Sequence, residues 1–347
     1  MNLFWSVYKN LEKEVISLSD ILHFDDNQSK IYSIHIASLL IRTAVEIESI
    51  SKHLYEKNGG NMYPTKSTGE KRDLMFDSDC IQLLDDLWHI TKKVVNVVSP
   101  TFYFSDKKNL ILVPLENCNK KGKGNWKKAY QAVKHDREKS LTSGNIENLL
   151  SAMAALYLLN IYNMDDKISD VSQGDTFCDW SIGSSLFSVN VYRATSLTMG
   201  IELNDSNIIS PPNSLDECVL IDKYTDNTFH ELYKNHILDS QITIENVKKS
   251  LELKAFLEKH PDYAEKKLSQ ICLACGEEIE CSKLGVIFPY QNNISQEIKK
   301  KIKESGINMV RAIISTANAS KFKSSKRELV LNKHKNIYPS LSLKNIV

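Results

Sequence analysis

Apolar residues recur at three- and four-residue steps through most of the first 165 positions of the chain, which is the spacing of amphipathic α-helices. A Gly-Gly pair at 59–60 provides a stop for the second of these patterns, and Ser143 or Asn145 provides an N-cap for the last. The segment 98–125 breaks the pattern and indicates a loop with one or two short strands. The predicted helices cover residues 2–22, 30–57, 78–98, 126–139 and 143–164.

The pattern changes near residue 166, where a polar and turn-rich segment begins. Runs of β-branched and aromatic residues then predict strands over residues 185–196, 217–225 and 284–290. Helical spacing returns over residues 226–238, 243–260, 262–276, 295–306 and 307–322. The sequence therefore predicts an α+β protein in two parts, an all-α helical bundle over residues 1–165 and a smaller mixed α+β domain over residues 166–347.

Composition places the chain among ordinary globular proteins, with 42% hydrophobic and 25% charged residues. A formal net charge of +1 gives no overall signature for nucleic acid or membrane, so any such signal has to be local. No secretory signal pattern opens the chain, and the longest apolar run, residues 149–162, is too short to span a bilayer. Seven cysteines, an odd number, predict reduced thiols. Together these features predict a cytoplasmic protein without membrane association.

A basic stretch over residues 124–141, GNWKKAYQAVKHDREKSL, is the first candidate for chemistry. On one continuous helix, Lys128 and His135 share a face with Glu138, and Arg137 lies at the edge of the apolar face. Histidine suits proton transfer in RNA cleavage because its pKa lies near neutrality, and a neighbouring cation stabilises charge on a phosphate. The alternative is a solvated helix face whose lysines maintain solubility.

A second polar pair lies on the long helix predicted over residues 30–57. Arg42 and Glu46 are one turn apart on this helix, and most of the residues around them are apolar. Charged side chains on a largely buried helix need partners, which are either each other or polar residues of a facing helix such as His135. The pair is therefore either a structural ion pair or part of a polar cluster that lines a cleft.

The first part of the chain resembles the higher-eukaryote-and-prokaryote nucleotide-binding (HEPN) domains. The resemblance rests on the order of three segments: HIASLLIRTAVEIESISKHLY, then WKKAYQAVKHDR, then NIENLLSAMAALYLLNIY. HEPN domains are helical bundles, often dimeric, and many are metal-independent ribonucleases of toxin-antitoxin and phage-defence systems. Their motif is an arginine, often followed by a polar residue, and then a histidine four to six residues later. His135 matches the histidine, and Lys128 stands where the family has arginine.

The resemblance implies a metal-independent ribonuclease or RNA-binding effector of a bacterial phage-defence or toxin-type system. In this reading His135 transfers protons, Lys128 and Arg137 contact phosphate, and Arg42 and Glu46 orient the cluster. RNA, a second copy of the bundle and a protein partner or antitoxin are the expected partners, and no cofactor is expected. The alternative is a non-catalytic module for dimerisation or partner binding.

Two features of the second part leave other functions open. Cys272, Cys275 and Cys281 lie within ten residues, and a Cys-x-x-Cys turn begins many zinc sites. A second pair of ligands is missing, so buried free thiols at a helix end are the alternative. Residues 298–335 contain eleven Lys or Arg against two Glu, which indicates either contact with a phosphate backbone or a solvated tail. Motifs of nucleotide-binding loops and zinc proteases are missing from the sequence.

Overall fold

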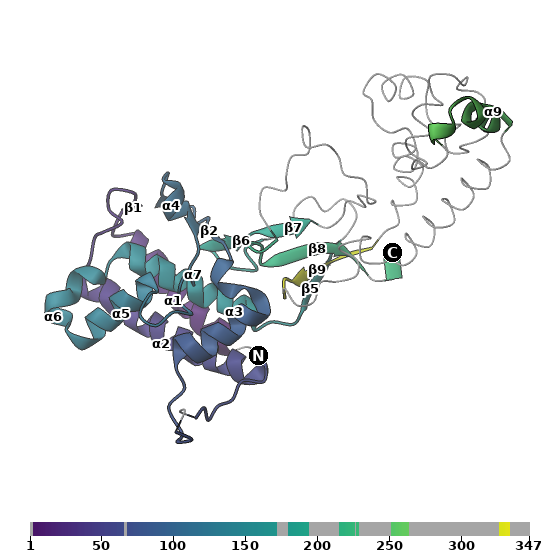
Figure 1. Cartoon of the computed structure of the whole chain (residues 1–347). Coiled ribbons are helices and arrows are strands. Elements are labelled where there is room, and N and C mark those ends of the chain that lie inside the picture. The colour runs from purple at the N-terminus through teal and green to yellow at the C-terminus, as the bar shows by residue number, and fades with distance from the viewer. Residues whose placement is uncertain are drawn as a thin grey trace. The chain divides into compact units, whose positions relative to one another are not determined.

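The computed structural model of the chain describes residues 3–65, 68–171, 180–193, 215–225, 227–228, 251–263 and 326–333. The predicted mixed α+β class is confirmed. By contacts the chain forms two compact units (Figure 1). The first unit contains residues Met1–Val171, Asp175–Lys223 and Glu328–Val347, and the second contains Ser172–Gly174 and Tyr224–Arg327.

A helical bundle forms the larger part of the first unit. Its main helices are α1 (Leu3–Ser19), α2 (Ile34–Lys57), α5 (Asn125–His135) and α7 (Ile146–Tyr162). The other three helices pack on α7, and α2 runs beside it (Figure 1). Nearly every side chain of α7 is buried, as its apolar residues on all sides require. This buried helix holds the core of the bundle together.

Local capping residues explain where two of these helices begin and end. Ser33 caps α2, and its hydroxyl accepts a hydrogen bond of 3.1 Å from the backbone N–H of Ile36. The predicted stop after α2 is confirmed, because α2 ends at Lys57, Asn58 is its C-cap and Gly59 adopts a positive φ of 86°. At the start of α7, Asn145 rather than Ser143 is the N-cap, accepting from the backbone N–H of Asn148 at 3.0 Å.

The helix predicted over residues 78–98 is wrong in its second half. The chain forms a π-helical turn η1 (Phe76–Ile81), a short helix α3 (Gln82–Trp88), a 3₁₀ turn η2 (Ile90–Lys92) and then strand β2 (Val95–Val97). His89 takes a left-handed conformation with φ 53°, which ends the α-helix. The valine-rich residues that follow prefer an extended backbone.

Three small sheets complete the described structure. Strand β1 (Phe24–Asp25) pairs in parallel with β3 (Phe102–Tyr103). Strand β2 pairs antiparallel with both β4 (Ile111–Leu112) and β6 (Phe187–Val189). The third sheet has the order β5 (Lys167–Val171), β9 (Arg327–Leu331), β8 (Leu220–Tyr224) and β7 (Val191–Arg193). The two predicted strands 185–196 and 217–225 are confirmed, although the first divides into β6 and β7 at Asn190.

A buried carboxylate joins α1 to the segment that precedes β6. Glu12 accepts hydrogen bonds from the Ser184 hydroxyl at 2.6 Å and the Ser185 backbone N–H at 2.8 Å, and it also bonds Tyr8 and Lys9. Burial alone would raise the pKa of Glu12, but these donors outweigh it and lower that pKa. The charged side chain therefore fixes residues 184–186 against the bundle.

In the second unit the structure describes one helix, α9 (Leu251–Lys259), followed by a 3₁₀ turn η4 (Pro261–Tyr263). The helix falls within the predicted helix 243–260. The ring of Phe256 contacts those of His260 and Tyr263, with centroids 4.7 and 5.7 Å apart. Of the helix predicted over 226–238 only residues 227–228 are described, and they are helical; of the helix predicted over 262–276 only residues 262–263 are described, and they lie in η4. The predicted strand 284–290 and the helices predicted over 295–306 and 307–322 lie outside the described residues.

Candidate functional site

The basic helix α5 buries one face and exposes the other. Trp126, Tyr130 and Val133 are buried, and the Trp126 indole N–H donates to the Pro114 carbonyl at 2.8 Å. Lys128 and His135 lie on the opposite, exposed face, as the spacing predicted. The apolar anchor therefore orients α5 so that its cations point to solvent.

The helix predicted over 126–139 is interrupted at Asp136. This residue has φ −145° and ψ 83°, so α5 ends at His135, and a separate short helix α6 (Arg137–Ser140) follows. The Asp136 carboxylate accepts from the Lys139 backbone N–H at 3.1 Å, which caps α6. Aspartate competes with a continuous helix through such local bonds. As a result Arg137 and Glu138 lie on α6 and not on the faces of α5 where they were expected.

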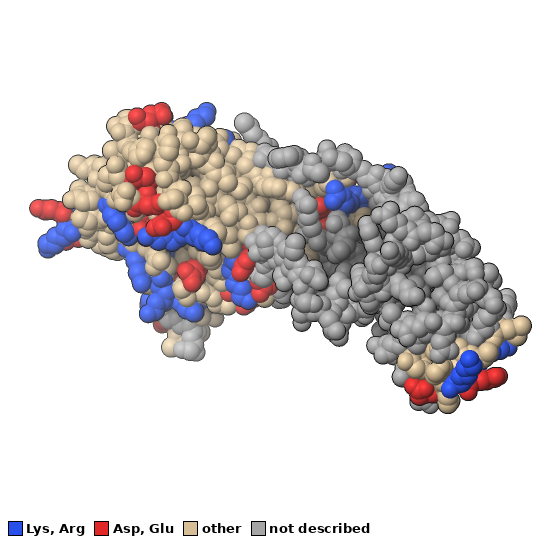
Figure 2. All heavy atoms as spheres, turned by 90° about the horizontal axis from the view of Figure 1, so that it is seen from above, with Lys and Arg blue, Asp and Glu red and all other residues tan. Residues whose placement is uncertain are grey.

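Cations gather along α5, α6 and the loop before them. Residues 120–139 contain eight Lys or Arg against two acidic residues, in a chain of net charge +1. We call the exposed members the basic face, which comprises Lys120, Lys121, Lys123, Lys128, Lys134, Arg137 and Lys139. Figure 2 shows lysine and arginine side chains in clusters along one edge of the first unit, interspersed with acidic ones.

Few of these cations are neutralised within the described part of the chain. Lys127, which is largely covered, lies 3.7 Å from Asp77 and 4.0 Å from the centre of the Phe76 ring. Lys139 lies 3.6 Å from Asp136. The remaining basic-face cations form no ion pair with any residue that the structure describes, so their positive charge is available to a ligand.

Lys128 and His135 are spaced for two contacts rather than one. His135 is seven positions after Lys128 along α5, which corresponds to about 10 Å along the helix axis. Groups that act on one scissile phosphate have to lie within hydrogen-bond reach of it. The two side chains therefore suit successive points on an extended anionic ligand better than a single reacting atom.

The second predicted pair lies on another side of α2. The Arg42 guanidinium donates two hydrogen bonds of 2.7 Å to Glu14 on α1, which raises the pKa of Arg42 and lowers that of Glu14. Ala37, five residues earlier, contacts Gly144 just beyond α6, and five residues correspond to about 140° around a helix. In the described structure no hydrogen bond or ion pair joins Arg42 or Glu46 to Lys128, His135 or Arg137. The structure therefore does not bring the five predicted site residues together.

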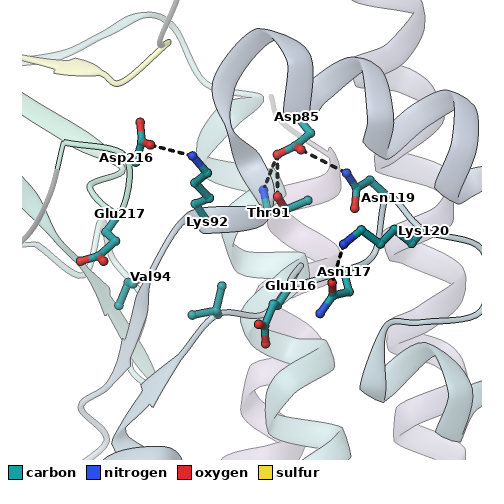
Figure 3. Close-up of a pocket in the computed structure, with 11 residues that line it drawn as sticks. Asp85, Thr91, Lys92, Val94, Glu116, Asn117, Asn119, Lys120, Asp216 and Glu217 are labelled. Atoms are coloured by element: carbon teal, nitrogen blue, oxygen red, sulfur yellow. Dashed lines mark hydrogen bonds and ion pairs between the residues drawn. The ribbon is translucent and has the colours of Figure 1, made fainter.

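A polar pocket of about 500 Å³ lies elsewhere in the first unit (Figure 3). Asp85, in the middle of α3, accepts from the Thr91 hydroxyl at 2.7 Å and from the Asn119 amide at 3.2 Å. On the other side Lys92 donates to Asp216 at 2.8 Å (Figure 3). Sequence reasoning missed this pocket because its walls come from three segments that are far apart along the chain.

The charge of this pocket argues against an anionic ligand. Four carboxylates line it against two ammonium groups: Asp85, Glu116, Asp216 and Glu217 against Lys92 and Lys120. Burial alone would raise the pKa of Asp216, but hydrogen bonds with Lys92 and His89 lower it to about 2, so Asp216 is ionised at neutral pH. Among the residues that the structure describes, no three His, Cys, Asp or Glu side chains are grouped to hold a metal ion.

Several predicted features fall wholly or partly outside the described residues. Cys272, Cys275 and Cys281 lie there, so the zinc hypothesis stays a prediction. Of the basic segment 298–335, only residues 326–333 are described, and they form β9 and its flanks. Within the described ranges, no helix combines the length and the apolar character needed to cross a membrane.

Comparison with known proteins adds no relative. No family model matches the chain, and neither the curated proteins nor the solved structures contain a significant match.

Proposed function

We propose that the protein binds RNA through the basic face of α5, α6 and the preceding loop. The observation that carries the proposal is the local charge: eight cations against two acids over residues 120–139, mostly exposed and unpaired in the described structure. Lys and Arg side chains that neutralise phosphates and release counterions supply most of the affinity in such interfaces. The HEPN-like order of helices in residues 1–165 favours RNA over DNA as the ligand.

Charge-neutralised variants test this proposal. Lys128→Gln, Lys134→Gln and Arg137→Gln combined should weaken binding of a labelled single-stranded RNA by about 30-fold or more at 50 mM salt, because three phosphate contacts are removed. Fluorescence anisotropy measures the affinity. A matched control combines Lys13→Gln, Lys52→Gln and Lys57→Gln, which remove three exposed lysines from α1 and α2.

The control should bind as the wild type does, since its lysines lie outside the basic face. Equal losses in both triple variants would mean that net charge alone drives association, and the proposed interface would be wrong. If the protein binds DNA of the same sequence more tightly than RNA, then DNA rather than RNA is the ligand.

RNA cleavage by His135 is a second candidate function. Its supporting observation is an exposed imidazole at the last residue of α5, one position after Lys134 and two positions before Arg137. In a metal-independent mechanism the imidazole accepts the proton of the ribose 2′-hydroxyl, which attacks the adjacent phosphorus and leaves a cyclic phosphate end. This mechanism needs a second group to protonate the leaving oxygen, and Arg42 and Glu46 on another side of α2 are not placed for it.

His135→Ala separates cleavage from binding. If His135 is catalytic, the variant should lose cleavage in the presence of a chelator while RNA affinity falls less than threefold. Mass spectrometry of the products should show cyclic phosphate ends for the wild type alone. A wild type that binds RNA without cleaving it would leave the binding function intact and remove the catalytic one.

The biological system, oligomeric state and protein partner that we propose come from the resemblance to HEPN domains alone. In this proposal the protein is a cytoplasmic effector of a bacterial phage-defence or toxin-type system. It acts as a homodimer through the helical bundle, with an antitoxin as a further partner. If RNA binding fails, a non-catalytic dimerisation module is the alternative that the same bundle supports. Nucleic-acid binding through the basic C-terminal segment, residues 298–335, is the other alternative.

A further inference from the structure

Tyr32 is an aromatic side chain left open to solvent immediately before α2. Its exposed fraction is 49%, although a tyrosine ring carries enough apolar surface to favour burial. Among the residues that the structure describes, its hydroxyl has no hydrogen-bond partner, and its ring makes no stacking or cation–π contact. The neighbouring Ile31 packs against the core, so the alternation of an extended backbone directs Tyr32 outward.

Long-range pairing places Tyr32 beside the residues that connect α6, the end of the basic face, to α7. Tyr32 and Asn145 form an antiparallel bridge, and the Ile146 backbone N–H donates to the Ile31 carbonyl at 3.1 Å. Gly144 also packs tightly against Ala37 in α2. The segment that carries Tyr32 therefore runs beside residues 144–146. A 3₁₀ turn, Leu141–Ser143, connects these residues to α6, which carries Arg137 and Lys139.

We propose that Tyr32 is a stacking platform for an unpaired base of the bound RNA, so that the ligand of the basic face is single-stranded. This inference rests on the proposed RNA-binding function. Single-stranded nucleic acids are bound by a cationic track for the backbone together with aromatic rings on which bases stack. The basic face supplies the track and Tyr32 supplies the ring. Bases within a duplex already stack on one another, so an isolated ring gains little from duplex RNA.

A second exposed tyrosine provides a matched control. Tyr103 has an exposed fraction of 61%, but its ring already stacks on His23 at a centroid distance of 4.5 Å. Acidic residues lie nearby: Asp25 is 3.9 Å from His23, and Asp106, three residues after Tyr103, is 3.2 Å from Lys108. Tyr103 is therefore as accessible as Tyr32 but has an occupied ring face and acidic surroundings.

The test compares an unstructured 12-nucleotide RNA with a duplex of the same length by fluorescence anisotropy. Tyr32→Ala should lower the affinity for the single strand by about tenfold, within the range of stacking one base on an aromatic ring. Tyr32→Phe should retain wild-type affinity because the ring remains. Tyr103→Ala should have no effect, and duplex binding should be the same in all four proteins.

Any different outcome contradicts either the stacking inference alone or the RNA-binding proposal as well. If Tyr32→Ala binds the single strand as the wild type does, or loses single strand and duplex equally, the stacking inference is wrong while RNA binding stands. A loss in Tyr32→Phe as large as in Tyr32→Ala also refutes stacking, since it points to the hydroxyl or to folding. If the wild type binds neither RNA, the proposed function itself fails, and the inference fails with it.

Discussion

Lys93 is fully buried, and its neighbours in sequence, Lys92 and Val94, line the polar pocket. No described residue accepts a hydrogen bond from the Lys93 amine. Burial lowers the pKa of Lys93 to about 8, although Asp216 acts in the opposite direction. Because the unfolded chain has an ordinary lysine pKa of about 10.4, the native state at neutral pH bears the penalty of a buried ammonium. An uncompensated buried charge destabilises a fold more than an apolar side chain of similar size.

Lys93→Met should therefore raise the free energy of unfolding at pH 7 by about 2 kcal/mol. The lowered pKa of Lys93 corresponds to roughly 3 kcal/mol, which is the upper limit of this gain. In the wild type, stability should increase as pH rises from about 8 to about 10, because there the unfolded state binds the proton that the native state has released. This increase should be absent in Lys93→Met. Urea unfolding at several pH values measures both effects.

Lys92→Met is the control, since Lys92 is about half exposed and pairs with Asp216. Removing it should lower stability by no more than about 1 kcal/mol and should leave the rise between pH 8 and 10 in place. A Lys93→Met protein that is less stable than the wild type would show that the amine has a stabilising partner.

At the scale of secondary-structure elements, the interruption between α5 and α6 has opposite consequences for folding and for binding. Asp136 caps α6 and is one of two acids within the basic region. Asp136→Ala should lower the free energy of unfolding by about 1 kcal/mol through loss of the cap. RNA affinity should rise about two- to fivefold at low salt, because a repelling charge is removed and Lys139 is freed.

Thermal unfolding and anisotropy on the same preparations check this prediction. Asp20→Ala, an exposed aspartate after α1, should change neither quantity appreciably. If Asp136→Ala weakens RNA binding, then the turn between the two helices, rather than their charge, is what the ligand requires.

The elements also show where local sequence signals suffice and where they do not. The face of α5 that carries Lys128 and His135 was predictable because apolar residues at helical spacing fix the buried side. The end of α3 was not, because His89 adopts a left-handed conformation that is uncommon for residues other than glycine. Apolar periodicity across residues 78–98 fits a helix as well as a helix followed by a strand, and pairing with β4 and β6 decides between them.

At the scale of the whole molecule, composition and periodicity were enough for the α+β class but not for the long-range contacts. The pairing of β2 with β6 joins residues 95–97 to 187–189, and Glu12 ties α1 to the same region. The bridge between Tyr32 and Asn145 is also invisible in the linear pattern. Such contacts depend on the packing of distant segments. The basic face was therefore partly predictable from sequence, whereas its aromatic neighbour and the polar pocket were not.

The central claim is that the basic face binds RNA by neutralising phosphates. The most direct test is the salt dependence of RNA affinity between 50 and 200 mM salt, because each neutralised phosphate of a single strand adds about −0.7 to the slope of log K against log salt. The wild type should show a slope between about −3 and −5, and the variant with Lys128→Gln, Lys134→Gln and Arg137→Gln should be shallower by about 2. A slope near zero, or the same slope in both proteins, would contradict the account.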